Sequence, residues 1–195
     1  VGRILRHIAL IARYVLSYSI LLFSYCTPRF PSIWIFGSRL GQYYQDNSRF
    51  LFEFVCNNVK DIHPIWITRN REVYDYLRSQ GRSVYMMLSL RGIFYSLIAK
   101  VAIICVNHDD LLKETLGGAK IIHLWHAAQI KKKVTERLIY GRNFIDIIKS
   151  KMQRIDLVTV SSQNQVNLIS YVMNVDKTKI KITGYPKTDC LIALF

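Results

Sequence analysis

His126 stands where a buried strand is predicted to end, so its type and place could support acid–base chemistry. An apolar run over residues 121–125 predicts the strand, and small residues follow the histidine. Ligands of open α/β sheets bind outside the carboxyl ends of the strands. An imidazole there titrates at about pH 6.5 and can take a proton from a hydroxyl. The same position also suits a histidine that only caps the strand end, and the residues by themselves leave both interpretations open.

Three lysines follow this histidine one turn further on: Lys131, Lys132 and Lys133. They can bind phosphate as point charges. At the start of a helix, cations oppose the positive end of the helix dipole, and this conflict favours an anionic ligand nearby. The alternative is a solvated basic face on an ordinary helix.

Asp46 and Asn47 come directly before a helix predicted over residues 49–57. Both are good helix caps, as is Ser48. Capping is therefore the first interpretation of these side chains, and contact with a substrate is the second.

The neighbouring residues His108, Asp109 and Asp110 are ligand types that could hold a metal ion. Asp109 is explained as a helix cap, however, and the sequence has no second cluster of carboxylates or histidines. We therefore expect neither a metal nor a cofactor. His123 lies inside the predicted strand and is expected to be a core imidazole whose hydrogen bonds are satisfied.

The net charge of the chain limits the classes of binding partner that are expected. Among 195 residues, 27 are Lys or Arg and 13 are Asp or Glu, which gives a net charge of +14. Such an excess favours nucleic acid, anionic lipid or phosphate-rich substrates. The aromatic residues do not alternate with the basic ones as a stacking surface requires, which argues against nucleic acid. Oligomeric state has no signature in the sequence.

The four cysteines, Cys26, Cys56, Cys105 and Cys190, are scattered and form no C-x-x-C pair. Three of them lie inside apolar runs. We expect reduced core residues in a cytosolic protein and no zinc site.

The order of elements predicts a doubly wound, Rossmann-like α/β domain over residues 31–195. Strands are expected at residues 32–37, 64–68, 83–88, 101–106, 121–125, 156–160 and 179–183. Helices are expected at residues 49–57, 71–80, 92–100, 131–140, 144–152 and 163–173, the last opened by an S-x-x-Q capping box at Ser162. Strands alternating with helices at this spacing imply a parallel sheet covered on both faces.

Residues 1–30 predict a basic amphipathic helix followed by a proline-containing linker. At 100° per residue, Arg6, Arg13, Ser17 and Ser24 share one stripe, and apolar side chains cover the rest. This pattern is typical of a helix that lies in a membrane interface with its arginines at anionic head groups. A transmembrane anchor and a helix that packs on a partner are the alternatives, although Arg13 interrupts the apolar length needed for spanning.

Several segments resemble motifs of the CDP-glycerol glycerophosphotransferase family, the teichoic-acid primases and polymerases with related capsule-polymer enzymes. Residues 123–132 (HLWHAAQIKK) are similar to the family's W-H-G-T-x-x-K, with Ala127 and Ala128 in place of glycine and threonine. Residues 184–189 (GYPKTD) are similar to G-Y-P-R-x-D. Residues 156–162 and 41–47 resemble two weaker motifs, D-x-hydrophobic-x-x-S-S and G-x-x-Y-x-D-N. The resemblance spans roughly residues 33–192.

The resemblance implies the N-terminal, acceptor-side domain of a GT-B glycosyltransferase-like enzyme, without its C-terminal nucleotide-binding domain. The chain starts without methionine and ends just after a strand, as expected of a fragment. Family members sit peripherally on the cytoplasmic face of the cell membrane. They transfer glycerol phosphate, or a related alditol phosphate, from a CDP-linked donor to a hydroxyl of a lipid-linked polymer, and release CMP.

The resemblance also assigns roles to individual residues. It implies that His126 is the general base. It implies substrate-binding roles for a group of polar residues: Asp46, Asn47, Lys131, Lys132, Lys187 and Asp189. The alternative to an enzyme is a non-catalytic module that binds anionic lipid or a polymer.

Overall fold

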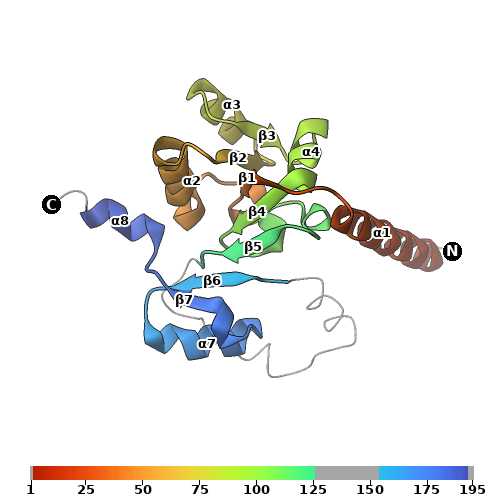
Figure 1. Ribbon diagram of the computed structural model, residues 1–195. Helices are drawn as coiled ribbons and strands as arrows, with labels where there is room; N and C mark the ends of the chain where they lie inside the picture. Colours follow the sequence, from red (N-terminus) through yellow and green to blue (C-terminus); the bar gives the residue numbers. More distant parts are fainter. Residues whose placement is uncertain (1, 126–153, 193–195) are drawn as a thin grey trace.

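The computed structural model of the chain describes residues 2–125 and 154–192, and its strands form one parallel sheet (Figure 1). The described strands are β1 (Phe30–Phe36), β2 (His63–Thr68), β3 (Val84–Met86), β4 (Ala99–Ile104), β5 (Lys120–His123), β6 (Leu157–Val160) and β7 (Ile180–Ile182). Their order in the sheet is β3-β2-β1-β4-β5-β6-β7, and every pair is parallel. The predicted doubly wound α/β fold is confirmed. The order reverses between β1 and β4, which is where such folds bind ligands.

Helices cover both faces of this sheet, as its apolar strands require. The described helices are α1 (Gly2–Tyr25), α2 (Asp46–Asn58), α3 (Arg71–Ser79), α4 (Leu90–Ile98), α7 (Gln163–Met173) and α8 (Pro186–Ile192). Phe52 of α2 and Leu77 of α3 pack with Trp66 on one face. Ile65 and Leu111 belong to the core on the opposite face, against which α4 packs. The sheet is therefore a rigid base for the residues at its edges.

Some local predictions of caps were right and others were wrong. Asn70 directly precedes the helix predicted at 71–80, and its residue type predicts a cap. It does cap α3, its side chain accepting a hydrogen bond from the Glu72 amide at 2.8 Å. The capping box at Ser162 is wrong: Ser162 precedes α7 but makes no side-chain cap. The Gln165 side chain instead accepts from the Ser161 amide at 2.9 Å. Between β4 and β5 the chain forms two short 3-10 turns, η2 (His108–Asp110) and η3 (Lys113–Thr115). The helices predicted at 131–140 and 144–152 lie outside the described residues.

The cysteines are less buried than predicted. Cys105 is fully buried, Cys56 is half-buried and Cys26 is exposed, and all three are free thiols. Cys26 directly follows the end of α1 and is exposed, so its place in an apolar run did not make it a core residue. The side chain of Cys190 lies outside the described residues.

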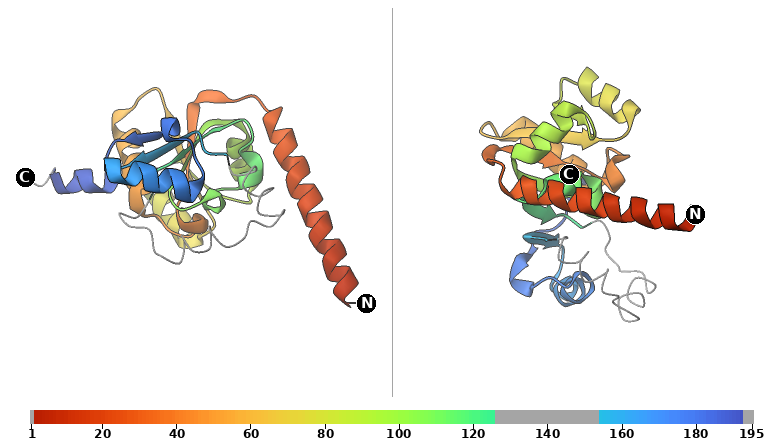
Figure 2. Two further views of the ribbon diagram at one scale, coloured as in Figure 1. Left: turned by 90° about the horizontal axis from the view of Figure 1, so that it is seen from below. Right: turned by 90° about the vertical axis from the view of Figure 1, so that its right-hand side faces the viewer.

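Helix α1 projects from the body of the protein, and its C-terminal end packs on the domain (Figure 2). Two serines of the predicted polar stripe face the protein: the Ser17 hydroxyl donates to Glu114 at 3.2 Å, and the Ser24 hydroxyl accepts from the Gly117 amide at 2.9 Å. Large apolar side chains are exposed along the same helix: Tyr14, Val15, Leu16, Tyr18, Ile20, Leu22, Phe23 and Tyr25. None of the described helices is both long and apolar enough to cross a membrane.

Candidate active site

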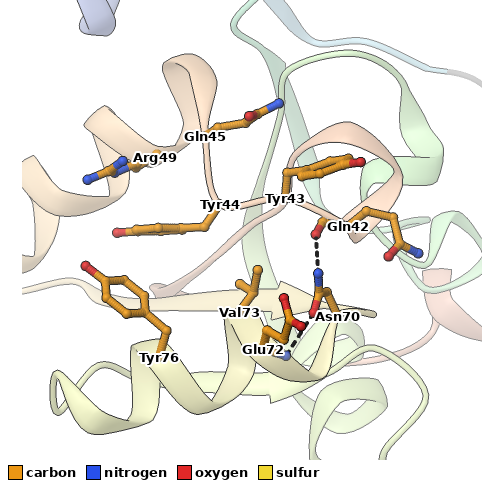
Figure 3. A pocket seen from close by; sticks show the side chains of 9 residues that line it. All are labelled: Gln42, Tyr43, Tyr44, Gln45, Arg49, Asn70, Glu72, Val73 and Tyr76. Atoms are coloured by element: carbon orange, nitrogen blue, oxygen red, sulfur yellow. Dashed lines mark hydrogen bonds between the residues drawn. The ribbon is translucent and has the colours of Figure 1, made fainter.

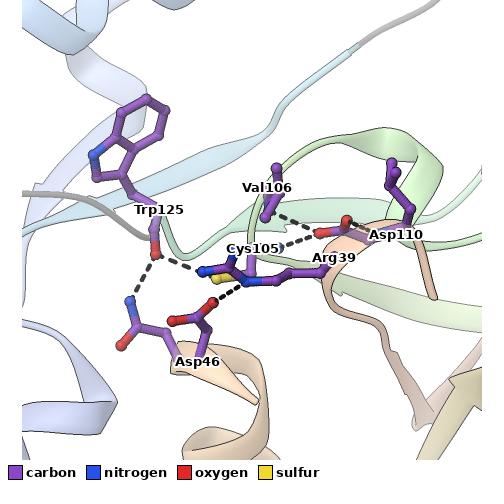
Figure 4. Close-up of polar contacts among 8 residues, drawn as sticks. Arg39, Asp46, Cys105, Val106, Asp110 and Trp125 are labelled. Atoms are coloured by element: carbon purple, nitrogen blue, oxygen red, sulfur yellow. Dashed lines mark hydrogen bonds and ion pairs between the residues drawn. The ribbon is translucent and has the colours of Figure 1, made fainter. Parts of the chain in front are cut away.

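The carboxyl ends of β1, β4 and β5 meet the start of α2, and a buried carboxylate ties two of them together (Figure 4). Asp110 is fully buried. One of its oxygens accepts from the amides of Cys105 (2.9 Å) and Val106 (2.7 Å), just after β4. The other accepts from the Leu40 amide at 2.8 Å, in the 3-10 turn η1 (Arg39–Gly41) after β1. Asp110 thus fixes the loop after β1 against the end of β4.

The Asn47 side chain joins three segments that are far apart in sequence. This residue is fully buried in the first turn of α2. Its amide nitrogen donates to the carbonyls of Leu124 (3.2 Å) and Trp125 (2.6 Å), directly after β5. Its amide oxygen accepts from the Lys187 amide at 3.2 Å, at the start of α8. Asn47 therefore holds the backbone that leads into His126.

Cys105 supports the same carbonyl. Its buried thiol donates to the Trp125 carbonyl, with the sulfur 3.5 Å from the oxygen. Burial and the nearby Asp46 carboxylate raise the pKa of the Cys105 thiol to about 12, although the amides of Ser48 and Asn47 act in the opposite direction. The sulfur is therefore a neutral hydrogen-bond donor at physiological pH, and it does not act as a nucleophile.

His123 orders the turn between β5 and His126. The ring is buried, its Nδ1 accepts from the Trp125 amide at 3.0 Å, and its Nε2 lies 3.1 Å from the Val106 carbonyl. The carbonyl can only accept, so Nε2 carries the proton and the imidazole is neutral. The predicted core imidazole is confirmed.

Backbone strain is concentrated at this edge of the sheet. Within the described residues, positive φ angles at non-glycine positions occur at Arg39 (43°), Leu40 (61°), Asp46 (60°), Trp125 (48°) and Asn174 (51°). The first four belong to the segments just described. Such conformations are disfavoured for L-residues, persist only where the surroundings impose them, and cluster at functional sites.

Asp46 is held by a neighbour that sequence reasoning missed. The Arg39 guanidinium contacts the Asp46 carboxylate at 2.7 Å, and that hydrogen bond raises the pKa of Arg39. Figure 4 shows the pair beside Cys105. Asp46 is the first residue of α2, and Gln45 occupies the cap position, so neither Asp46 nor Asn47 caps the helix as first interpreted.

Of the other candidate residues, two lie in α8 and three lie outside the described residues. Lys187 lies in the first turn of α8, with its ammonium 6.0 Å from the centre of the Tyr185 ring. Asp189 is exposed in the same turn. His126, Lys131 and Lys132 lie outside the described residues.

Sequence reasoning also missed Asp110, because it considered only Asn107 or Asp109 as the helix cap here and gave Asp110 no structural role. Asp109 forms an ion pair with Lys113 at 2.7 Å, and the cap of η2 is Asn107, which accepts from the Asp109 amide. His108 is buried, with Nε2 2.9 Å from the Arg154 carbonyl. The signal that could have identified Asp110 is its place just beyond the end of a predicted strand.

Comparisons with known proteins identify the family and the fold. The family model for CDP-glycerol:poly(glycerophosphate) glycerophosphotransferases matches residues 20–193. A teichoic acid glycerol-phosphate transferase of Staphylococcus aureus (strain NCTC 8325 / PS 47) is 24% identical over 163 residues, covering 80% of this chain and 41% of the relative. The chain thus spans about two fifths of that relative.

Solved structures of the wall teichoic acid polymerase TagF have the same fold. One superimposes with a TM-score of 0.67 at 16% identity, covering 99% of this chain and 49% of TagF. A TagF variant gives a TM-score of 0.68 at 15% identity, covering 98% and 49%. Because the family model covers most of its length, this chain belongs to the CDP-glycerol:poly(glycerophosphate) glycerophosphotransferase family.

Proposed function

We propose that this chain is the acceptor-side part of an enzyme that transfers glycerol phosphate, or a related alditol phosphate, from a CDP-linked donor to a hydroxyl of a lipid-linked cell-envelope polymer. Membership of the family supports the type of reaction. The relatives, a glycerol-phosphate transferase and a teichoic acid polymerase, support the class of donor and product.

One observation carries the proposal to particular residues. Four segments resemble family motifs and lie far apart in sequence, yet Asn47 in residues 41–47 binds two of the others. Its amide nitrogen donates to the Trp125 carbonyl in residues 123–132, and its amide oxygen accepts from the Lys187 amide in residues 184–189. A buried side chain with several satisfied hydrogen bonds fixes geometry because breaking them leaves unpaired polar groups. The arrangement supports a site in which these three motifs act together.

His126 is the general base of the proposed reaction. It takes the proton from the acceptor hydroxyl as that oxygen attacks the phosphorus that bears the glycerol. The bond between this phosphorus and the bridging oxygen of CMP breaks, and CMP leaves with the electron pair. Charge on the transferred phosphoryl group is stabilised by positioned cations, the role assigned to Lys131 and Lys132. Lys187 and Asp189 bind substrate in this scheme, and Asp46 orients Arg39 toward the same edge.

The enzyme works on the cytoplasmic face of the membrane as a peripheral protein. The exposed aromatic and aliphatic side chains of α1 support this placement, as does the net charge of +14. Apolar side chains that project from a helix bury readily at the boundary between head groups and acyl chains, and basic residues add attraction to anionic lipid.

The proposal is tested by measuring CMP release from CDP-glycerol with a lipid-linked acceptor, using the full-length protein and its His126→Ala variant. We expect a loss of roughly 10²–10⁴-fold, the usual contribution of a general base. His63→Ala, which changes an exposed histidine on the amino end of β2, is the matched control and should keep the wild-type rate.

Substantial turnover by His126→Ala would exclude the assigned role. The alternative, a non-catalytic module that binds anionic lipid or polymer, predicts salt-sensitive binding to vesicles that His126→Ala leaves unchanged, with no cleavage of the nucleotide.

A further inference from the structure

A recess lies beside the proposed active site, between the loop at residues 42–45 and helix α3 (Figure 3). Its volume is about 400 Å³. Asn70 fixes its rim, because its amide donates to the Gln42 carbonyl at 3.1 Å while its oxygen caps α3. The recess opens at the carboxyl ends of β1 and β2, and Gln45 in its wall directly precedes Asp46 and Asn47.

One wall of this recess is a rigid aromatic ring. The Tyr44 hydroxyl donates to Glu53, and its ring stands edge-on to Trp66 with 4.7 Å between centroids. The guanidinium of Arg49 lies 5.1 Å from the centre of the Tyr44 ring. Packing and hydrogen bonding thus fix the orientation of this wall before any ligand binds.

Two further tyrosines present rings that the fold leaves largely exposed. Tyr43 is 56% exposed and Tyr76 is 51% exposed, although both line the recess. Figure 3 shows Tyr76 reaching from α3 toward Tyr44, and the ring centroids of the two are 6.2 Å apart. Exposed aromatic side chains with a polar tip are the usual contact residues of recognition sites.

The polar groups of the recess suit a neutral ligand rich in hydroxyls. Arg49 and Glu72 carry opposite charges, so the lining has no net charge to attract a phosphate. The side chains of Gln42 and Gln45 add amide donors and acceptors. Amides and a carboxylate around aromatic rings match a sugar, which offers apolar C–H faces and a rim of hydroxyls.

We infer that this recess is a carbohydrate subsite that holds a sugar ring of the acceptor next to the reacting hydroxyl. The identity of the acceptor rests on the proposed function, whereas the recess and the chemistry of its lining do not depend on it. Tyr43 and Tyr76 stack on the ring, and Arg49, Glu72 and the glutamines bind its hydroxyls. In the proposed function, Lys131 and Lys132 bind the phosphate instead.

The test measures binding without requiring catalysis. Saturation-transfer and titration NMR with cellobiose and methyl β-D-glucopyranoside, against sn-glycerol 3-phosphate, are applied to the wild-type protein and its variants. Tyr76→Ala and Tyr43→Ala should each weaken binding of the glycosides about tenfold, as for anchor residues of an interface. Tyr76→Phe, which keeps the ring, should retain most of the affinity. Tyr171→Ala, which removes an equally exposed tyrosine from α7, is the matched control and should bind as the wild type does.

Saturation transfer to the glycosides that Tyr76→Ala weakens and Tyr171→Ala leaves unchanged supports the subsite. The inference is overturned if the glycosides do not bind, if Tyr76→Ala and Tyr171→Ala bind them equally, or if only glycerol phosphate binds in the recess. A separate assay of CMP release tests the proposed function independently of the subsite. With an active enzyme, Tyr43→Ala and Tyr76→Ala should raise the KM for a sugar-containing acceptor and leave the KM for CDP-glycerol unchanged. Glycosides that bind in the recess of a protein releasing no CMP would uphold the subsite and refute the proposed reaction.

Discussion

The parallel strands all begin at one edge of the sheet, here called the amino edge, and all end at the other, the carboxyl edge. Polar side chains hold both edges together, but the two edges are built in different ways. At the amino edge, the Arg29 guanidinium donates to four backbone carbonyls, those of Ser24, Ser96, Ala99 and Thr115. These carbonyls precede or begin β1, β4 and β5, and none of these residues has a positive φ angle. At the carboxyl edge, the side chains of Asn47 and Asp110 hold the backbone segments together, and residues with positive φ angles lie beside them.

This difference indicates that the amino edge mainly stabilises the fold, whereas the carboxyl edge holds the geometry that the proposed reaction needs. At the amino edge, a single arginine joins backbone segments whose residues have ordinary φ angles. The carboxyl edge keeps four residues in left-handed conformations, which is tolerated only where the structure imposes it. We therefore expect variants at the amino edge to lose stability and variants at the carboxyl edge to lose activity, beyond any change in stability.

The largest loss of stability is expected from Arg29→Ala. The change leaves four carbonyls without their charged donor, and we expect the free energy of unfolding to fall by about 4 kcal/mol. Burial, with a smaller contribution from Arg154, lowers the pKa of Arg29 to about 10, so the side chain is charged at neutral pH. Urea unfolding measures the change.

Arg29→Lys is the matched variant, because it keeps the charge but not the planar fork. It should lose roughly half as much stability. An alanine variant within about 1 kcal/mol of the wild type would show that Arg29 does not hold the amino edge.

Gly37→Ala should be the next largest change, at the opposite edge. A Cβ at this position would lie 2.3 Å from the Asp110 carbonyl oxygen and 2.8 Å from Leu111 Cδ2. The backbone of η2 would have to move, which we expect to cost about 3 kcal/mol in thermal or urea unfolding. Gly81→Ala is the control: nothing lies within 4 Å of its Cβ, so only its φ of +69° opposes alanine. Equal losses in the two variants would contradict the close approach of β1 to Asp110.

A smaller effect is expected from His108 when the pH falls. Burial lowers the pKa of His108, although the Arg154 carbonyl and the carboxylates of Asp109 and Asp110 act in the opposite direction. Below about pH 6.5, His108 binds a proton in the unfolded chain but stays neutral to lower pH in the folded protein, so the free energy of unfolding falls as the pH falls. Melting temperatures from pH 7.5 to pH 5.5 should decline less in His108→Gln than in the wild type. His63→Gln, an exposed site, should keep the wild-type slope, and identical slopes in all three would refute the effect.

The smallest change concerns thiol reactivity, since it leaves the fold intact. At pH 8, iodoacetamide should modify the exposed Cys26 first, the half-buried Cys56 more slowly and Cys105 last. With a pKa of about 12 and no exposure, Cys105 should react at least about a hundredfold more slowly than Cys26. Peptide mass spectrometry follows each site. Equal rates at Cys26 and Cys105 would contradict the closed carboxyl edge.

The strands and the fold class could be predicted from sequence because their signals are local. Each buried strand is a short apolar run between breaking residues, and Asn70 caps the helix that follows it within two residues. The exposed Cys26 shows the limit of this logic, since an apolar run does not say which side of a helix meets the protein.

The candidate site could be predicted only in part because its contacts are distant in sequence. The partners of Asn47 lie 77, 78 and 140 residues away, so no local rule distinguishes this role from helix capping. Local rules offered Asn107 or Asp109 as a helix cap and gave Asp110 no role, although Asp110 is the residue that reaches the loop after β1. The resemblance of motifs placed Asn47 and Lys187 in one site, but it gave no sign of Arg39, Cys105 or the recess beside Tyr76.

The most direct test compares CMP release from CDP-glycerol by Asn47→Ala and Arg29→Lys, each at a temperature where circular dichroism shows it fully folded. Releasing the Trp125 carbonyl moves the backbone before His126, and a displacement of about 1 Å can cost about a hundredfold in rate. We expect Asn47→Ala to lose about a hundredfold and Arg29→Lys to stay within about twofold of the wild type. A folded Asn47→Ala that releases CMP at the wild-type rate, or equal losses in the two variants, would contradict the division between the two edges of the sheet.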